Sequence, residues 1–149
     1  MTASTATNSL AVSLFSEILT VEQLARTSVA RVLPKGMELS QFAVLNHLAH
    51  TGLERTPAQL ARSFHLTRGA MTNTLRKLEW QGWVHVRPDW DDARQKLVRV
   101  SPAGLAARNA ALETIVPLIA DVVDTVGAEK VRAALPVLRE LRVKLQGGE

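Results

Sequence analysis

The sequence predicts a mainly α-helical fold with a small two-stranded β ribbon in its second half. Apolar residues recur at steps of three and four over most of the chain, which is the helical period. The period changes to two only after Gly82. With three Trp, three Phe and no Tyr, the core must be built from Leu, Val, Ile and Ala, which suits packed helices better than stacked sheets.

The composition fits one folded domain over residues 1–149, because 46% of the residues are apolar. A net charge of +4 favours a polyanionic partner. The absence of cysteine excludes disulfides, thiolate metal sites and thiol-based redox sensing within these residues. The polar N-terminus lacks the basic region of a signal peptide and no apolar run suits a membrane span, so we expect a cytoplasmic protein without a membrane partner.

Two helices are expected before residue 53. The first covers residues 9–33 and ends at Pro34, because its apolar residues form one broad stripe. The stripe consists of Leu10, Leu14, Ile18, Val21, Ala25, Val29 and Val32. The second covers residues 39–50, with Ser40 as a possible N-cap and Gly52 at its end. Its His47 and His50 are expected to be polar-face or interface residues, because no further ligand stands at a metal-binding spacing.

A pair of short helices follows with the spacing of a helix-turn-helix. Thr56 and Pro57 form a start signal, an N-cap followed by proline at the first helical position. After a connection of about three residues, Thr67 can cap a second helix that runs to Gln81 and stops at Gly82.

The second of these helices has one apolar and one basic face. Met71, Leu75 and Leu78 share the inward face. The opposite face carries polar and basic residues with no acid before Glu79, and such side chains can donate to phosphates and to base edges. These residues are Gly69, Asn73 and Arg76, flanked by Arg68, Thr72 and Lys77. An ordinary solvated face would mix Glu with Lys, so the pattern favours contact with nucleic acid.

Alternation of valine with polar residues predicts two strands, over residues 83–87 and 97–100. The loop between them contains Asp89, Asp91 and Asp92 but lacks the ligand spacing and glycine of a calcium loop. We expect these acids to form turns and to pair with Arg87 or Arg94.

The C-terminal part predicts two more helices. Ser101 and Pro102 repeat the start signal, and Leu105, Leu112, Ile119 and Val126 then recur seven apart. Pro117 is expected to kink this helix and Gly127 to end it. A last helix places Val131, Ala134, Leu138, Leu141 and Leu145 on one side.

No enzyme site is predicted. The sequence has no glycine-rich phosphate loop, no His-Glu-x-x-His and no nucleophile with a base at an arguable spacing. We therefore expect no catalytic residue, no cofactor and no metal.

The runs LEWQGWV and DWDDARQKLVRVSPAG resemble the signature of the MarR family of bacterial transcriptional regulators. The resemblance implies a winged helix-turn-helix homodimer, mainly α with a small two-stranded β wing. It implies a DNA-binding lobe at residues 53–101 and a helical dimerisation region at residues 9–34 and 102–146 within a single domain. Long apolar stripes in these helices independently favour a partner, because one small lobe could not cover them.

The resemblance makes residues 67–76 the recognition helix and residues 89–94 the wing that enters the minor groove. It implies that Asp89 and Asp92 orient the wing, with Asp92 orienting Arg94. This sequence departs from the usual Asp-x-Arg-Asp-Arg-Arg at Asp91 and Ala93, so two basic positions are missing. The expected contacts to double-stranded DNA are Thr67, Arg68, Gly69, Thr72, Asn73, Arg76, Lys77, Arg87, Arg94 and Lys96.

The expected function is that of a transcriptional regulator, most simply a repressor, that binds a pseudo-palindromic operator as a homodimer. The resemblance also implies a small aromatic or phenolic effector between the dimer helices and the lobe, for which Arg26, Arg31, His47 and His50 are the candidate contacts. The alternative is a winged-helix dimer that binds a protein or RNA without reading DNA specifically.

Overall fold

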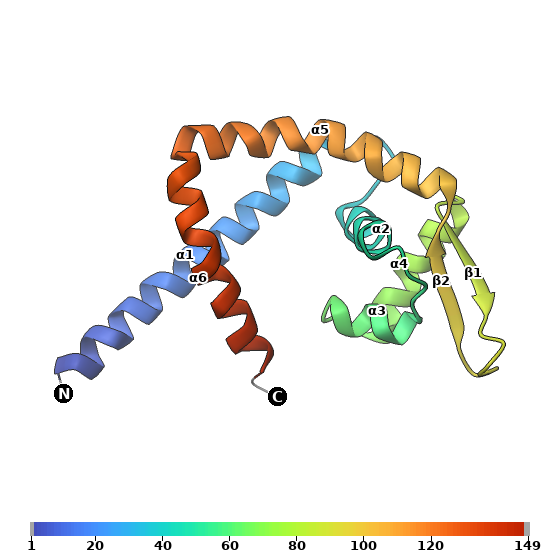
Figure 1. Cartoon of the computed structure of the whole chain (residues 1–149), viewed down its shortest axis with the longest axis horizontal. Coiled ribbons are helices and arrows are strands. Elements are labelled where there is room, and N and C mark those ends of the chain that lie inside the picture. Colours follow the sequence, from blue (N-terminus) through green and yellow to red (C-terminus); the bar gives the residue numbers. More distant parts are fainter. Residues whose placement is uncertain (1, 148–149) are drawn as a thin grey trace.

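The computed structural model describes the backbone of residues 2–147 and the side chains of residues 4–147. In chain order the elements are α1 (Thr2–Val32), α2 (Leu39–Thr51), α3 (Pro57–Ser63), α4 (Arg68–Trp80), β1 (Val84–Pro88), β2 (Lys96–Val100), α5 (Pro102–Val126) and α6 (Ala128–Gln146). In Figure 1, α2, α3, α4 and the two strands form a lobe at one end, while α1, most of α5 and α6 extend away from it. The mainly α fold with a two-stranded ribbon is confirmed.

One helix start and one N-cap differ from the prediction. Helix α1 begins at Thr2 instead of residue 9, because the polar residues before Leu10 include no glycine or proline that would stop a helix already formed. Helix α2 is capped by Glu38, and the proposed Ser40 cap is wrong. The Glu38 amide donates to Gln41 Oε1 at 2.7 Å, so the third helical side chain completes this start.

The predicted N-caps of α3, α4 and α5 are confirmed, and the other helix ends lie within one residue of their predicted positions. The hydroxyls of Thr56, Thr67 and Ser101 each accept a backbone amide of the first turn, at 3.1, 3.1 and 2.9 Å. Gly52 ends α2 with φ 65°, a left-handed conformation that glycine adopts without strain. Helix α5 continues through Pro117 to Val126, and the local kink at this proline stays a prediction.

The core lies in the lobe, between α2, α3, α4, the strands and the first half of α5. Met71, Leu75 and Leu78 of α4 are all buried, as the helical period predicted. They pack with Met37, Val44, Leu45, Leu48, Leu60, Ala61, Val84, Val98, Ala111 and Ile115. Three of these residues belong to α2, so the core extends beyond residues 53–101.

The strands pair antiparallel, with Val84 opposite Val100 and Val86 opposite Val98. Their valines face the core, and the polar residues between them face outward. Arg55 forms a bridge with Val98, so the loop before α3 lies along the other edge of β2.

Ser101 joins the ribbon to α5. Its hydroxyl donates to the Gly82 carbonyl at 2.6 Å and accepts from the Gly104 amide, while its own amide donates to the Trp83 carbonyl at 2.9 Å. Gly104 is needed here because a Cβ at this position would lie 1.9 Å from the Trp83 carbonyl oxygen. Residues 101–104, with the sequence Ser-Pro-x-Gly, therefore pack the start of α5 closely against the backbone just before β1.

The extended helices leave apolar side chains uncovered. Among the described residues, α6 has none that is buried. Large exposed apolar side chains on α1, α5 and α6 include Leu10, Leu19, Leu24, Ile119, Val122, Leu135, Leu138 and Leu145. Within the part of the chain that the structure describes, no helix has the length and apolar character needed to cross a lipid bilayer.

Candidate nucleic-acid interface

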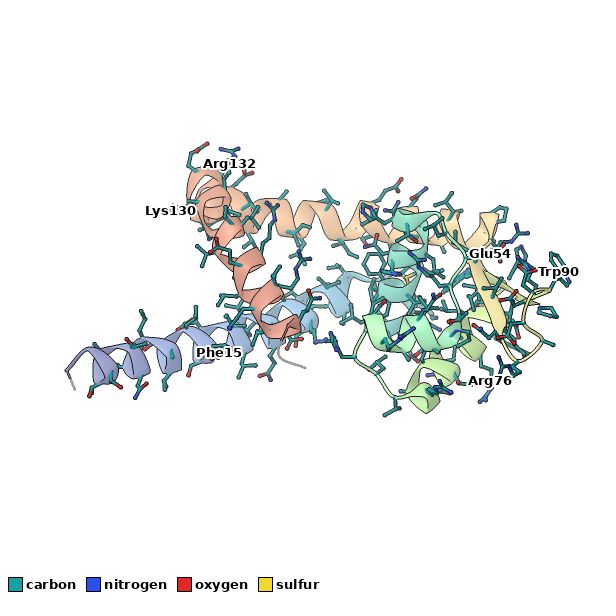
Figure 2. All side chains as sticks on the ribbon, turned by 60° about the horizontal axis from the view of Figure 1, so that its bottom comes forward. Phe15, Glu54, Arg76, Trp90, Lys130 and Arg132 are labelled. Atoms are coloured by element: carbon teal, nitrogen blue, oxygen red, sulfur yellow. The ribbon has the colours of Figure 1, made fainter. Side chains whose placement is uncertain are left out.

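The predicted outward face of α4 is exposed. Gly69, Asn73 and Arg76 all lie on the solvent side of the helix, as do their flanking residues. Figure 2 shows Arg76 pointing away from the body of the lobe. Thr67 has a second task, because its hydroxyl caps the helix. The N-terminal half of α4 thus presents small polar and basic side chains over a rigid, buried apolar face.

A cleft of about 690 Å³ separates this half of α4 from the β ribbon. From here on, the wing means the whole ribbon, residues 84–100, including the loop of residues 89–94. Arg62 of α3 and Arg68 of α4 line one side, and Arg94 and Lys96 line the other. Among the described residues that line the cleft, Asp92 is the only acid. Four basic residues against one acid produce a positive potential in a concave surface, which attracts polyanions.

Asp92 organises the wing loop, residues 89–95. Its carboxylate accepts Arg94 Nε at 3.0 Å, Arg94 Nη2 at 3.3 Å and Gln95 Nε2 at 2.9 Å, and it also accepts the Arg94 amide at 3.1 Å. The expected contact between Asp92 and the wing arginine is thus present. Asp89 accepts the Asp91 amide at 2.9 Å and forms the predicted turn.

These donors lower the pKa of Asp92 from 3.8 to about 2, with the Arg94 side chain as the largest cause and Gln95 next. Because the folded pKa lies below the unfolded one, the stabilisation is fully present above about pH 4 and is lost as the pH falls through about 2. The carboxylate is therefore ionised, and the wing loop ordered by it, at any physiological pH.

Of the two arginines named as partners of the wing aspartates, Arg94 pairs with Asp92 and Arg87 pairs with a different carboxylate. Arg87 Nη2 lies 2.9 Å from Glu54 Oε2, and Arg87 Nη1 donates to the Pro88 carbonyl at 3.0 Å. Glu54 Oε2 is buried without a well-oriented hydrogen bond, so the Arg87 charge compensates it. The guanidinium also lies 4.1 Å from the centre of the Trp90 ring, within cation–π range.

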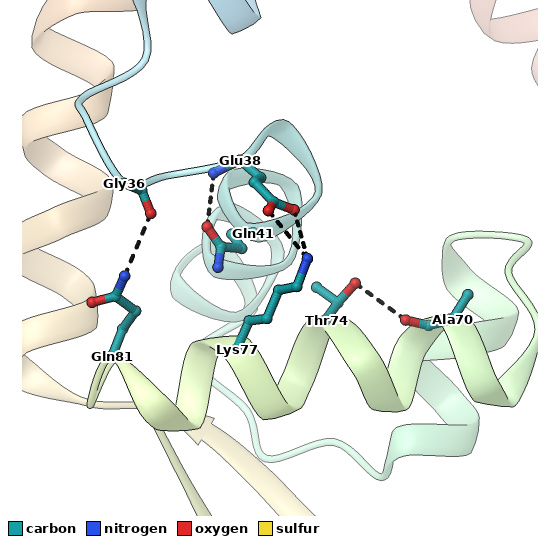
Figure 3. Close-up of polar contacts among 7 residues, drawn as sticks. All are labelled: Gly36, Glu38, Gln41, Ala70, Thr74, Lys77 and Gln81. Carbon is teal, nitrogen blue, oxygen red and sulfur yellow. Dashed lines mark hydrogen bonds and ion pairs between the residues drawn. The ribbon is translucent and has the colours of Figure 1, made fainter.

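Lys77 is held by a carboxylate from a distant part of the chain. Its Nζ donates to both oxygens of Glu38 at 3.1 Å, and Gln81 Nε2 donates to the Gly36 carbonyl at 3.4 Å (Figure 3). These contacts connect the C-terminal half of α4 to the segment that joins α1 to α2. Arg76 and Trp80 line a shallow pocket beside them.

Three of the four candidate effector residues line one groove of about 590 Å³ between α1 and α2. Arg26 comes from α1, while His47 and His50 come from α2; Arg31 is not part of the lining. Arg26 pairs with Glu22 in the same wall. His47 packs edge-on against Phe64, with ring centres 5.4 Å apart. The groove therefore combines aromatic rings with groups that can carry positive charge.

Several residues of these sites escaped sequence reasoning. Arg62 and Gln59 of α3 line the cleft, yet their own helix is too short to show a charged face. Glu38 and Glu54 pair with cations far along the chain, and no periodic pattern reports such pairs. Of these residues, Trp90 alone could have been recognised from its sequence neighbours, because an aromatic residue is unusual in a charged turn. Among the described residues, no group of three potential ligands could hold a metal ion.

Comparison with known proteins identifies relatives of this lobe. Residues 35–95 match the model of the MarR family. The multiple antibiotic resistance protein MarR of Salmonella typhimurium is 33% identical over 73 residues, which are 49% of this chain and 50% of the relative. The chain thus spans about half the length of the curated relatives it matches.

Solved structures extend the likeness to nearly the whole fold. The transcriptional regulator BldR from Sulfolobus solfataricus has a TM-score of 0.80 at 21% identity, over 89% of this chain and 94% of its own. Wild-type MarR from E. coli, in its apo form, has a TM-score of 0.75 at 25% identity, over 86% and 95%. A mutant MarR from E. coli complexed with operator DNA has a TM-score of 0.77 at 24% identity, over 87% and 94%.

Members of this family are transcriptional regulators, not enzymes. The family match covers α2 to the wing loop, and the structural likeness adds the long helices on either side. Residues 35–95 thus resemble the MarR family, and the fold of the chain is similar to that of solved MarR structures.

Proposed function

We propose that the protein is a DNA-binding transcriptional repressor that acts in the cytoplasm as a homodimer on a pseudo-palindromic operator. The observation that carries this proposal is the basic cleft between α3, α4 and the wing, next to the acid-free face of α4. Double-helical nucleic acid fits both features, because its phosphates suit the basic cleft and its major groove is wide enough for α4. The E. coli relative solved with operator DNA supports the choice of DNA as that nucleic acid.

The expected DNA contacts fall into two groups by position, those placed for phosphates and those placed for base edges. Arg62, Arg68, Arg94 and Lys96 surround the cleft and are placed to bind phosphates, which fix the position of a protein on the duplex. Asn73 and Arg76 lie on the outer face of α4 and are the candidates for base edges. Lys77 and Arg87 stay predicted contacts, but their carboxylate partners give them a second role in holding α4 and the wing in place.

Replacing Arg76 with alanine tests the α4 face. Loss of a bidentate base contact is expected to weaken operator binding by about 1–3 kcal/mol, and loss of a phosphate contact to lower the salt slope by about one. Fluorescence anisotropy over a salt series measures both. Lys35→Ala, which removes an exposed cation from the turn between α1 and α2, is the control and should change neither. If Arg76→Ala also leaves both unchanged, Arg76 does not contact the operator.

The homodimer is supported by the apolar faces of α1, α5 and α6. Leu19 is 66% exposed and Leu138 is 48% exposed. A monomeric protein rarely leaves so many large apolar side chains exposed to solvent, so a second copy of the chain is expected to bury them. A twofold axis through these helices would carry one lobe on each side. Two recognition helices about 34 Å apart would then read successive major grooves, which explains the expected pseudo-palindrome.

The effector is proposed to be a small aromatic carboxylate or phenolate in the groove between α1 and α2. Phe42 and Phe64 offer ring surfaces, and Arg26, His47 and His50 offer donors for the anionic group. Because α1 belongs to the proposed dimer region and α2 to the lobe, a ligand between them can favour one spacing of the lobes.

Benzoate is a suitable probe of this groove. We expect it to raise the melting temperature of the protein and to weaken operator binding, because it binds the folded state and prefers one lobe spacing. Thermal shift and anisotropy measure the two effects. His47→Ala should reduce both, whereas Arg31→Ala should not, since Arg31 does not line the groove. An equal response of the two variants would exclude this groove as the site.

A further inference from the structure

Trp90 lies in the wing loop with 81% of its surface exposed. Figure 2 shows it at the outer end of the wing, away from the core. A single exposed apolar residue on a protein surface needs no explanation. Trp90 differs because its ring contacts Arg87, which is itself bound to Glu54 in a separate segment of the chain.

The Arg87 guanidinium packs against the face of the Trp90 ring. The guanidinium lies 4.1 Å from the centre of the indole, while its edges bind Glu54 Oε2 at 2.9 Å and the Pro88 carbonyl at 3.0 Å. Glu54 lies in the loop before α3. The next residue, Arg55, forms a bridge with Val98 of β2. The series Glu54, Arg87 and Trp90 thus ties the exposed indole to the framework of the lobe.

The loop that carries Trp90 is ordered by its own backbone. The Asp89 amide donates to the Gln95 carbonyl at 3.1 Å, the Asp92 amide to the Asp89 carbonyl at 3.2 Å, and the Gln95 amide to the Asp92 carbonyl at 3.0 Å. A partner that meets this loop would therefore lose little conformational entropy in ordering it. The wing presents its indole in a preorganised position.

The surroundings indicate which partner this indole meets. The cleft beside the wing loop is lined by four basic residues and would draw a phosphate backbone against the wing. The loop itself has Asp91 and Ala93 near its tip, and so offers few cations of its own. Apolar side chains are effective in the minor groove, where they contact sugars and base edges and can enter between base steps.

We propose that Trp90 is the minor-groove contact of the wing, placed against the deoxyribose and base edges by Arg87 and Glu54. This inference rests on the proposed function, because it requires that the protein binds duplex DNA. The wing then adds an apolar contact that releases no counterion, while Arg94 and Lys96 contribute the phosphate contacts of the same element. Glu54 is a positioning residue, since it acts on DNA through Arg87 and the indole. Arg87 positions the indole in addition to its own predicted contact with DNA.

Anisotropy with the operator duplex over a salt series separates the two kinds of contact. Trp90→Ala is expected to weaken binding about tenfold at every salt concentration, leaving the salt slope unchanged. Arg94→Ala, the matched control on the same loop, should lower the slope by about one. Trp90→Phe should restore most of the affinity, because it keeps an aromatic ring. The melting temperature of Trp90→Ala should stay near that of the wild type, since the side chain is exposed.

Tryptophan fluorescence gives an independent readout. Adding operator duplex should change the emission of the wild-type protein, and Trp90→Phe should lose most of that change even though Trp80 and Trp83 remain. If the wild type binds the operator while Trp90→Ala binds equally well and the emission stays constant, the inference is wrong and the proposed function stands. If the wild type binds no duplex in a sequence-dependent way, both are wrong.

Discussion

Replacing Gly104 with alanine is expected to destabilise the protein by about 3 kcal/mol, because the added methyl group has no space. It would lie 1.9 Å from the carbonyl oxygen and 2.7 Å from the carbonyl carbon of Trp83. Both are backbone atoms at the start of the ribbon, so no side-chain rotation relieves the overlap. Helix α5 would have to move away from β1, which breaks the Ser101 contacts with Gly82 and Trp83.

Gly69→Ala is the matched control for this substitution. Nothing lies within 4 Å of a Cβ at Gly69, and the residue is in the first turn of α4 with ordinary helical geometry. Alanine there should stabilise the helix by about 0.5–1 kcal/mol. Urea unfolding of both variants at one protein concentration gives the comparison. Similar midpoints for the two variants would contradict the close packing of α5 against β1.

Leu138→Glu is expected to abolish the dimer and, with it, tight operator binding. Leu138 is 48% exposed on α6, a helix with no buried residue among those described. Twofold symmetry would place the new carboxylate in the interface twice, and burying an unpaired charge costs far more than the contact it replaces. The molecular mass should fall from about twice 16.3 kDa to 16.3 kDa. Operator affinity should drop about 100-fold or more, because the two half-sites are no longer bound together.

Light scattering coupled to size exclusion measures this mass, and circular dichroism checks that the helices persist. Leu53→Glu serves as the control, since it introduces the same charge at an exposed leucine outside α1, α5 and α6. It should remain dimeric. A wild-type protein that is already a monomer, or a Leu138→Glu variant with the wild-type mass, would rule out α6 as part of the dimer interface.

The features that the sequence predicted well depend on local rules. Met71, Leu75 and Leu78 of α4 are buried because the helical period alone decides which side of a helix faces the core. The caps at Thr56 and Thr67 follow from the preference of hydroxyls for the first-turn amides. The ribbon followed from the alternation of valines with polar residues.

The features that escaped prediction depend on contacts between distant segments. Lys77 binds Glu38, 39 residues earlier, and Arg87 binds Glu54 rather than its aspartate neighbours. Nothing in local spacing distinguishes a lysine that faces a distant carboxylate from one that faces solvent. The same limit applies to the basic cleft, because Arg62 joins it only through the packing of α3 against α4 and the wing.

The central claim is that the cleft and the α4 face bind DNA in a sequence-dependent way. Fluorescence anisotropy of the wild-type protein on the DNA upstream of its own gene, compared with scrambled DNA over a salt series, tests it most directly. We expect nanomolar affinity for the upstream fragment and a discrimination of about 1,000-fold or more, with affinity falling steeply as salt rises. Weak binding of equal strength to both duplexes would contradict the claim and favour a winged-helix module that binds a protein or RNA.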